Sequence, residues 1–185
     1  MGKGKVYPSE ISSYIDSISK AEITRLTSGM AHSFHLYFTN SGWYNNDSNL
    51  LIGSDKGGCT NLYSLDLQTG TQTQLTDFLR TDRVDIQGTF IHPYGEEAYF
   101  IKNNTIVALS LSTYEEKTLY HCPKDYHFSN VSCSSDGESI FFLALLRTYR
   151  IEFLATCLVV ILALLRSSKL VHTQRFVSYR LIRFR

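Results

Sequence analysis

Two histidines, His32 and His35, stand three residues apart and are the first side chains along the chain whose types could do chemistry. On a helix this spacing can place both imidazoles on one face, where they could share a metal ion. On a strand, residues three apart point to opposite faces, so one ion reaches both only across a bulge. The spacing leaves two further interpretations, which are contact of one histidine with a ligand and hydrogen-bonded structural roles.

Four more potential ligands, His121, Cys122, His127 and Cys133, form a looser group. Their spacings match no common metal-binding signature, and the four cysteines of the chain include no Cys-x-x-Cys pair. We therefore predict no metal site in this chain. We expect its cysteines to be reduced, mostly buried thiols.

Arg80 and Arg83 could bind a carboxylate, because a guanidinium donates two parallel hydrogen bonds to its oxygens. The alternative is that both arginines form surface salt bridges. The segment Asp55–Gly58 is typical of a tight hairpin turn, and the sequence has no Gly-x-Gly-x-x-Gly, Walker or nucleophile-elbow motif. We predict His32, His35, Arg80 and Arg83 as candidate substrate-binding residues and assign no catalytic residue.

Short strands separated by turn residues must position these side chains. Apolar runs alternate with gaps of Gly, Asn, Asp, Ser and Thr, which is typical of antiparallel strands. The clearest unit comprises residues 48–55, 61–67 and 71–76, and a weaker copy comprises 98–101, 105–111 and 116–119. A third unit begins at 135–143, and residues 23–27 look like a lone closing strand. We interpret residues 30–42 as an inner strand and residues 43–47 as a surface turn.

The leucines that close these units recur at a nearly constant interval. Leu26, Leu75 and Leu119 are spaced by 49 and 44 residues. A period in the forties with three or four strands per unit indicates the blades of a β-propeller. Stacking blades around an axis buries the faces that a single blade leaves open. We predict an all-β fold containing about two to three antiparallel blades of a partial β-propeller; the alternative is a β-sandwich with coincidental spacing.

The composition changes abruptly at residue 147. Residues 1–146 carry 10 Lys and Arg against 16 Asp and Glu, a net charge of −6, whereas residues 147–185 carry 8 against 1, a net charge of +7. Residues 153–165 are uncharged and rich in Leu and Ala, which favours a helix, but this run is shorter than the roughly 20 residues that span a bilayer. Two hypotheses explain the tail: a shifted reading frame in a truncated gene, or a tail anchor or interfacial helix.

These patterns divide the chain into three segments. We predict an N-terminal extension at residues 1–22, a partial β-propeller at 23–146 and a non-propeller, helical tail at 147–185. The N-terminus lacks the apolar region of a secretory signal, which predicts a cytoplasmic protein. Membrane association is the alternative if the tail is genuine. The acidic folded part excludes nucleic-acid binding.

Residues 32–39, 50–55 and 61–77 resemble the start of oligogalacturonate lyases, and Arg25–Thr27 fits the entry strand of that family. The similarity covers residues 3–143. A Leu-Asp-Leu-x-Thr-Gly turn and a Gln-Leu-Thr strand occur in many propellers, including TolB-like ones. The order of the motifs and the His-x-x-His-x-Tyr-Phe-Thr stretch favour the lyases.

The resemblance implies a seven-bladed propeller that cleaves short pectin-derived oligogalacturonides by β-elimination. In that reaction a base removes the C5 proton of a uronic acid, while a divalent metal, manganese in this family, or an arginine stabilises the charge on the C6 carboxylate. The resemblance places the family's His and Gln metal ligands and its base on later blades. We therefore expect this chain to hold no cofactor and to be a truncated, inactive form.

Three functions remain open. The first is an oligogalacturonate-lyase-like protein that is represented by its N-terminal blades and has oligogalacturonides as its partner. Alternatively, the chain is a non-catalytic propeller fragment that binds carbohydrate or protein. The third possibility is a tail-anchored β-protein.

Overall fold

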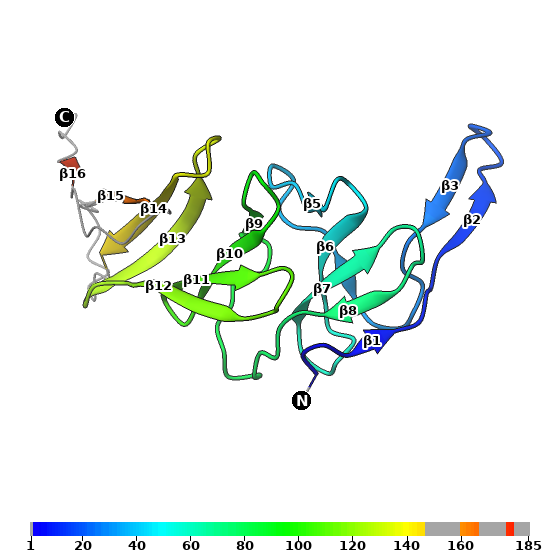
Figure 1. Cartoon of the computed structure of the whole chain (residues 1–185), viewed down its shortest axis with the longest axis horizontal. Coiled ribbons are helices and arrows are strands. Elements are labelled where there is room, and N and C mark those ends of the chain that lie inside the picture. The colour runs from blue at the N-terminus through cyan, green and yellow to red at the C-terminus, as the bar shows by residue number, and fades with distance from the viewer. Residues whose placement is uncertain (1, 147–159, 167–176, 180–185) are drawn as a thin grey trace, which may run out of the picture.

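The computed structural model describes residues 2–146, 160–166 and 177–179. Every regular element in these ranges is a strand, and none is a helix, which confirms the all-β prediction for them. None of the described residues therefore belongs to a helix that could cross a membrane. Three larger antiparallel sheets lie side by side, and a separate two-stranded hairpin stands beyond the first of them (Figure 1).

The first sheet confirms the clearest predicted unit and adds strands at both edges. Its order is β1 (Val6–Tyr7), β8 (Gln72–Gln74), β7 (Asn61–Asp66), β6 (Asn49–Ser54) and β4 (Ser33–Phe34). Only Ser33–Phe34 of the predicted inner strand at residues 30–42 forms a strand. The short strand β5 (Trp43–Tyr44), which also pairs with β6, lies in the predicted surface turn at residues 43–47. The outermost strand β1 comes from the N-terminal extension and pairs Val6 with Thr73.

The second sheet repeats the same arrangement. Its order is β12 (Glu116–His121), β11 (Thr105–Ser110), β10 (Glu97–Lys102) and β9 (Phe90–Ile91). Asn103 and Asn104 form the turn between β10 and β11 with φ values of 49° and 61°. Asparagine tolerates this left-handed conformation, which matches the twist of a tight hairpin.

The third sheet shows that the prediction of a helical tail is wrong for the described part of the tail. Its order is β13 (Tyr126–Cys133), β14 (Ser139–Leu146), β15 (Val160–Arg166) and β16 (Val177–Tyr179). The backbone edge of β14 needs hydrogen-bond partners, and a strand satisfies them where a helix cannot. The tail thus continues the third sheet in these two stretches, and its other residues lie outside the described residues.

The remaining hairpin joins β2 (Ser12–Ile15) to β3 (Glu22–Arg25). The sequence pattern identified residues 23–27 as a lone closing strand, whereas β3 pairs with a local partner that the pattern did not reveal. Both strands are almost entirely exposed, including Tyr14, Ile15 and Ile23.

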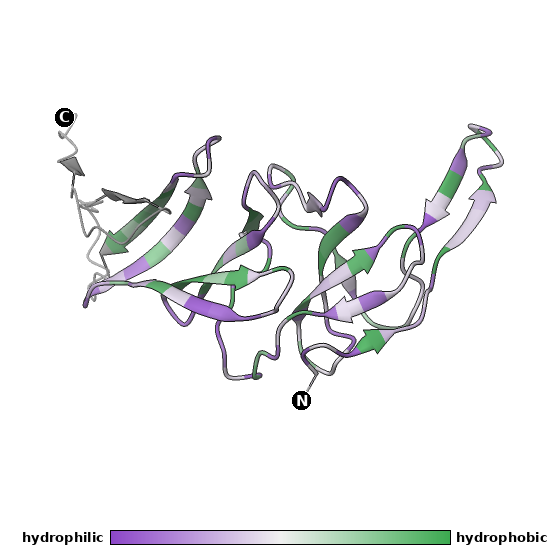
Figure 2. Ribbon diagram, viewed as in Figure 1, coloured by the Kyte–Doolittle hydropathy of each residue, from purple (hydrophilic) through white to green (hydrophobic). Residues whose placement is uncertain are grey.

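Two apolar clusters hold the three sheets together. Central strands carry apolar residues on both faces, and Figure 2 shows hydrophobic segments along them. On β10, Phe100 belongs to the cluster against the first sheet, whereas Tyr99 and Ile101 belong to the cluster against the third. This alternation follows from the two-residue period of a strand. Each sheet therefore packs only on its neighbours.

Gly53 of β6 lies where two side chains approach the strand closely. A Cβ atom at this position would lie 2.5 Å from the Phe34 ring and 2.7 Å from Cγ2 of Ile86. We expect Gly53→Ala to lower the free energy of unfolding by about 1–3 kcal/mol, the usual cost of overpacking, as measured by guanidinium denaturation. Combining it with Phe34→Leu should recover part of the loss. An identical loss in both variants would contradict overlap as the cause.

The N-terminal extension is fastened to the first sheet through Glu10. Its carboxylate accepts hydrogen bonds from the backbone N–H groups of Ser28 at 3.1 Å and Gly29 at 3.2 Å. Lys56, whose side chain is 10% exposed, donates to the same carboxylate at 2.5 Å. The Lys56 hydrogen bond is the main reason why the pKa of Glu10 falls from 4.5 to about 2.

Candidate functional site

One end of the first two sheets brings together loops that are distant in sequence. Before β4, His32 meets the β6–β7 turn, where Asp55 accepts hydrogen bonds from His32 N at 2.8 Å and pairs with His32 Nδ1 at 3.0 Å. The connection between β8 and β9 meets both this turn and the β10–β11 turn. These loops share one end because successive antiparallel strands reverse direction.

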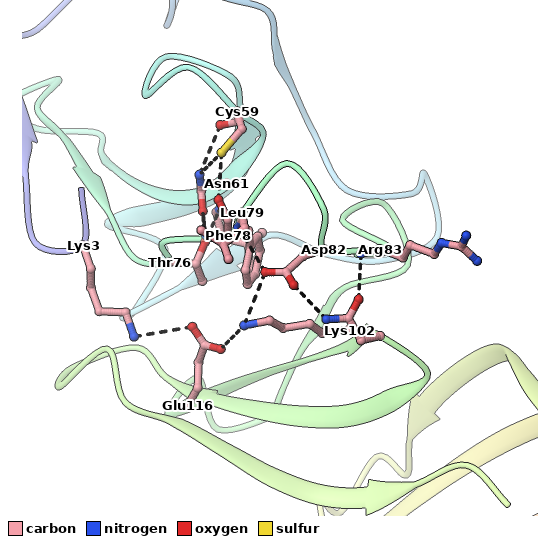
Figure 3. Close-up of polar contacts among 12 residues, drawn as sticks. Lys3, Cys59, Asn61, Thr76, Phe78, Leu79, Asp82, Arg83, Lys102 and Glu116 are labelled. Carbon is pink, nitrogen blue, oxygen red and sulfur yellow. Dashed lines mark hydrogen bonds and ion pairs between the residues drawn. The ribbon is translucent and has the colours of Figure 1, made fainter. Parts of the chain in front are cut away.

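Arg80 and Arg83 both lie exposed on the β8–β9 connection. Arg80 Nη2 donates to the carbonyl of Gly58 at 3.2 Å, and the backbone N–H of Arg83 donates to Asn103 Oδ1 at 2.9 Å. Figure 3 shows the Arg83 guanidinium pointing away from the other labelled side chains. Neither guanidinium forms an ion pair with a carboxylate in the part of the chain that the structure describes.

A cavity of about 450 Å³ opens between the β6–β7 turn and the β8–β9 connection. Asp55 and Gly58 line it from the turn, and Arg80, Asp82 and Ile86 line it from the connection. The structure thus places His32, through its partner Asp55, and Arg80 at the same cavity. Arg83 follows one residue after Asp82.

The carboxylates at this end already have partners. Asp82 accepts hydrogen bonds from Asn103 Nδ2 at 2.8 Å and from the N–H of Leu79 at 3.0 Å, and these lower its pKa. The hydrogen bond from His32 likewise lowers the pKa of Asp55. Both side chains therefore stay ionised, and neither forms an ion pair with Arg80 or Arg83.

An ion-pair network continues from Asp82 toward the outer edge of the second sheet. Lys102 Nζ lies 3.9 Å from Asp82 and 3.0 Å from Glu116, and Glu116 lies 3.4 Å from Lys3 Nζ (Figure 3). The network joins the N-terminal extension to β12. It also holds the middle of the β8–β9 connection against β10.

Asn61 fixes the start of this connection. Its side chain is 1% exposed, and its Oδ1 accepts hydrogen bonds from Thr76 Oγ1 at 2.9 Å and from the N–H of Phe78 at 2.7 Å (Figure 3). Cys59 Sγ donates to the Phe78 carbonyl at 2.8 Å. Sequence reasoning gave Asn61 no role; its one signal is an amide at the first position of an apolar strand.

His35 lies apart from these loops, between β4 and β5. Its Nδ1 is 3.1 Å from the carbonyl of Leu36, and its ring lies against Gly42. His92, which sequence reasoning also passed over, holds the third sheet through Nε2, at 3.1 Å from the Gly137 carbonyl. The two predicted histidines, His32 and His35, thus have separate partners.

The looser His and Cys group does not form a metal centre. Within residues 2–146, 160–166 and 177–179, no three His, Cys, Asp or Glu side chains come close enough to hold one ion. His121 Nδ1 instead lies 3.0 Å from Thr105 Oγ1, and burial raises the pKa of the Cys133 thiol. The described residues therefore do not fit a metal site.

A larger cavity, of about 780 Å³, lies between the first two sheets at the opposite ends of their strands. The turns that follow β5, β7, β9 and β11 line it, and they contribute Tyr44, Asp66, Tyr94 and Tyr114. None of the four predicted substrate-binding residues lines this cavity.

Antiparallel sheets of about four strands, each packed face to face on the next, define the blades of a β-propeller. A solved structure of an oligogalacturonate lyase in complex with manganese superimposes with a TM-score of 0.81, covering 96% of this chain and 48% of that chain. At 24% sequence identity, this likeness establishes the fold.

The sequence comparisons identify the family. The family model for oligogalacturonate lyase matches residues 1–144, so the chain belongs to the oligogalacturonate lyase family. It is 33% identical over 127 residues to an oligogalacturonide lyase of Pectobacterium atrosepticum and to an oligogalacturonate lyase of Dickeya dadantii. The match covers 68% of this chain and 32% of each relative, so the chain spans about a third of their length.

Proposed function

We propose that this chain binds short oligogalacturonides and does not eliminate them by itself. The observation that carries the proposal is the pair of exposed guanidinium groups, Arg80 and Arg83, which have no carboxylate partner among the described residues. Each galacturonate carries one carboxylate, and a guanidinium can hold it through two charge-assisted hydrogen bonds. Family membership supplies the substrate class.

The charge distribution sharpens this proposal. Residues 1–146 carry a net charge of −6, so the folded part as a whole repels an anionic sugar. Binding must therefore depend on a local positive site. Asp55 and Asp82 line the same cavity and keep their negative charge, but they hydrogen-bond to His32 and Asn103 and form no ion pair with either arginine.

The proposal assigns binding without turnover because the resemblance places the family's metal ligands and base on later blades, and the match covers only 32% of each relative. His32 hydrogen-bonds to Asp55 beside the cavity, and His35 lies apart, against Leu36 and Gly42. The resemblance implies that the family uses manganese, and one relative was solved with that ion. Among the described residues, no three His, Cys, Asp or Glu side chains lie close enough together to bind it.

The test is calorimetric titration of the chain with trigalacturonate. We expect binding that weakens as salt is added, because ions screen the carboxylate–guanidinium attraction. Replacing both arginines, Arg80→Gln with Arg83→Gln, should weaken binding by about 10- to 100-fold, the effect of losing hydrogen bonds to charged groups. Arg25→Gln, on the distant hairpin, is the matched control and should leave the affinity unchanged.

Two results would contradict the proposal. Equal affinity for trigalacturonate and for a neutral galactose trimer would show that the carboxylates are not read. A rise in the ultraviolet absorbance of unsaturated uronides, with the chain and manganese supplied together, would show that this chain turns the substrate over.

A further inference from the structure

The segment between β4 and β5 of the first sheet exposes two adjacent aromatic rings. Tyr37 is 50% exposed and Phe38 is 83% exposed, and their ring centroids lie 4.4 Å apart. They occupy the segment between β4 and β5, which we call the inner loop, residues 35–42. Aromatic rings bury more apolar area than other side chains, so two adjacent exposed rings offer a large apolar contact surface to a ligand.

The inner loop is fixed in place and does not simply fray. The N–H of Tyr37 donates to the carbonyl of Gln87 at 2.8 Å, and Asn40 Nδ2 donates to the carbonyl of Thr89 at 3.1 Å. Leu36, immediately before the rings, is 4% exposed in the core between the first two sheets. The backbone of the loop is thus already ordered, so only the side-chain rotamers of the two rings need to be fixed when a ligand binds.

The position of the loop indicates what the rings meet. β4, β5 and β9 form one edge of their sheets, and the inner edges of propeller blades line the central channel. The loop contacts the same β8–β9 connection that carries Arg83. The backbone from Arg83 to Gln87 spans at most about 14 Å, which an oligosaccharide of a few sugars can cover.

We propose that Tyr37 and Phe38 form a stacking platform for a pyranose ring of the oligogalacturonide whose carboxylates the arginines bind. A pyranose presents a C–H face that is apolar and packs on an aromatic ring, while its hydroxyl and carboxylate groups project from the rim. The platform therefore packs on the apolar face of the sugar ring, and the arginines bind its carboxylate. This inference rests on the proposed function and adds positioning residues to the same site.

The single tryptophan of the chain makes the platform testable. Trp43 is 46% exposed at the start of β5, five residues beyond Phe38, so its emission reports on the inner loop. In a titration with trigalacturonate, we expect Phe38→Ala to weaken binding about tenfold. Its salt dependence should match that of the wild type, because no charge has been removed.

Two further variants serve as controls. Phe38→Tyr keeps the ring and should bind within about twofold of the wild type. Tyr94→Ala removes an equally open ring, 69% exposed, at the opposite ends of the strands and should change nothing. Circular dichroism spectra that match the wild type would show that each variant is folded.

The outcomes separate this inference from the function on which it rests. Absence of binding by the wild type would remove the proposed function and the platform together. Wild-type binding that Tyr37→Ala and Phe38→Ala both leave intact would overturn the platform alone. A dimer that Phe38→Ala converts to a monomer with unchanged sugar affinity would also overturn it, since the rings would then bind a second copy.

Discussion

Replacing Phe100 with alanine should lower the free energy of unfolding by about 3–5 kcal/mol, the range for deleting a buried phenylalanine. The ring is fully buried in the core between the first two sheets and meets Phe78 edge to face at 5.4 Å. Small domains are stable by only about 5–15 kcal/mol, so this loss should remove a large part of the chain's stability. Guanidinium denaturation followed by Trp43 emission measures the effect.

Phe38→Ala is the matched control for this prediction. It removes the same atoms from a side chain that is 83% exposed, so its effect should stay within about 0.5 kcal/mol. Equal destabilisation by the two substitutions would contradict the assignment of Phe100 to the core and of Phe38 to the surface.

The second large effect is a loss of stability at low pH, which depends on Glu10. The pKa of Glu10 is about 2 in the folded chain and 4.5 as its ordinary value, so its stabilisation is fully present above pH 4.5 and is lost as the pH falls toward 2. Because the carboxylate is 22% exposed, we expect on the order of 2 kcal/mol. Unfolding free energies at a series of pH values should show this loss in the wild type and not in Glu10→Gln.

The partner of Glu10 supplies the control. Glu10→Gln leaves the nearly buried Lys56 ammonium without a counter-charge. Removing one partner of such a pair destabilises a protein more than replacing both partners with uncharged residues. The double variant Glu10→Gln with Lys56→Met should therefore be more stable than Glu10→Gln alone. A double variant that is less stable than the single one would show that Lys56 stabilises the sheet without Glu10.

Local pattern was enough to predict the strands whose partners are local. β6, β7, β10 and β11 follow apolar runs that end at Gly, Asn or Asp turns, and their hairpin partners are adjacent in sequence. β1 could not be found this way, because two residues carry no period and their partner β8 lies more than 60 residues away. β15 was expected to be helical because Leu and Ala favour helices, yet the open edge of β14 decides its state.

The site divides along the same line. Arg80 and His32 stay predictions as substrate contacts, although the alternation of strand direction, which the sequence pattern indicates, does bring their loops to one end. The structural roles of Asn103 and Asn61 could not be predicted, because an amide side chain gains its role only from the groups that folding places around it. Tyr37 and Phe38 lie within the predicted inner strand at residues 30–42, whereas the structure has them in the loop between β4 and β5.

The pairing of Val6 with Thr73 has a consequence for biosynthesis. β1 leaves the ribosome before the other strands of its sheet but cannot pair until β8 has emerged. Until then the nascent chain must carry Val6 and Tyr7 unpaired. A bulky fusion at the amino terminus would delay this step more than the same fusion at the carboxyl terminus.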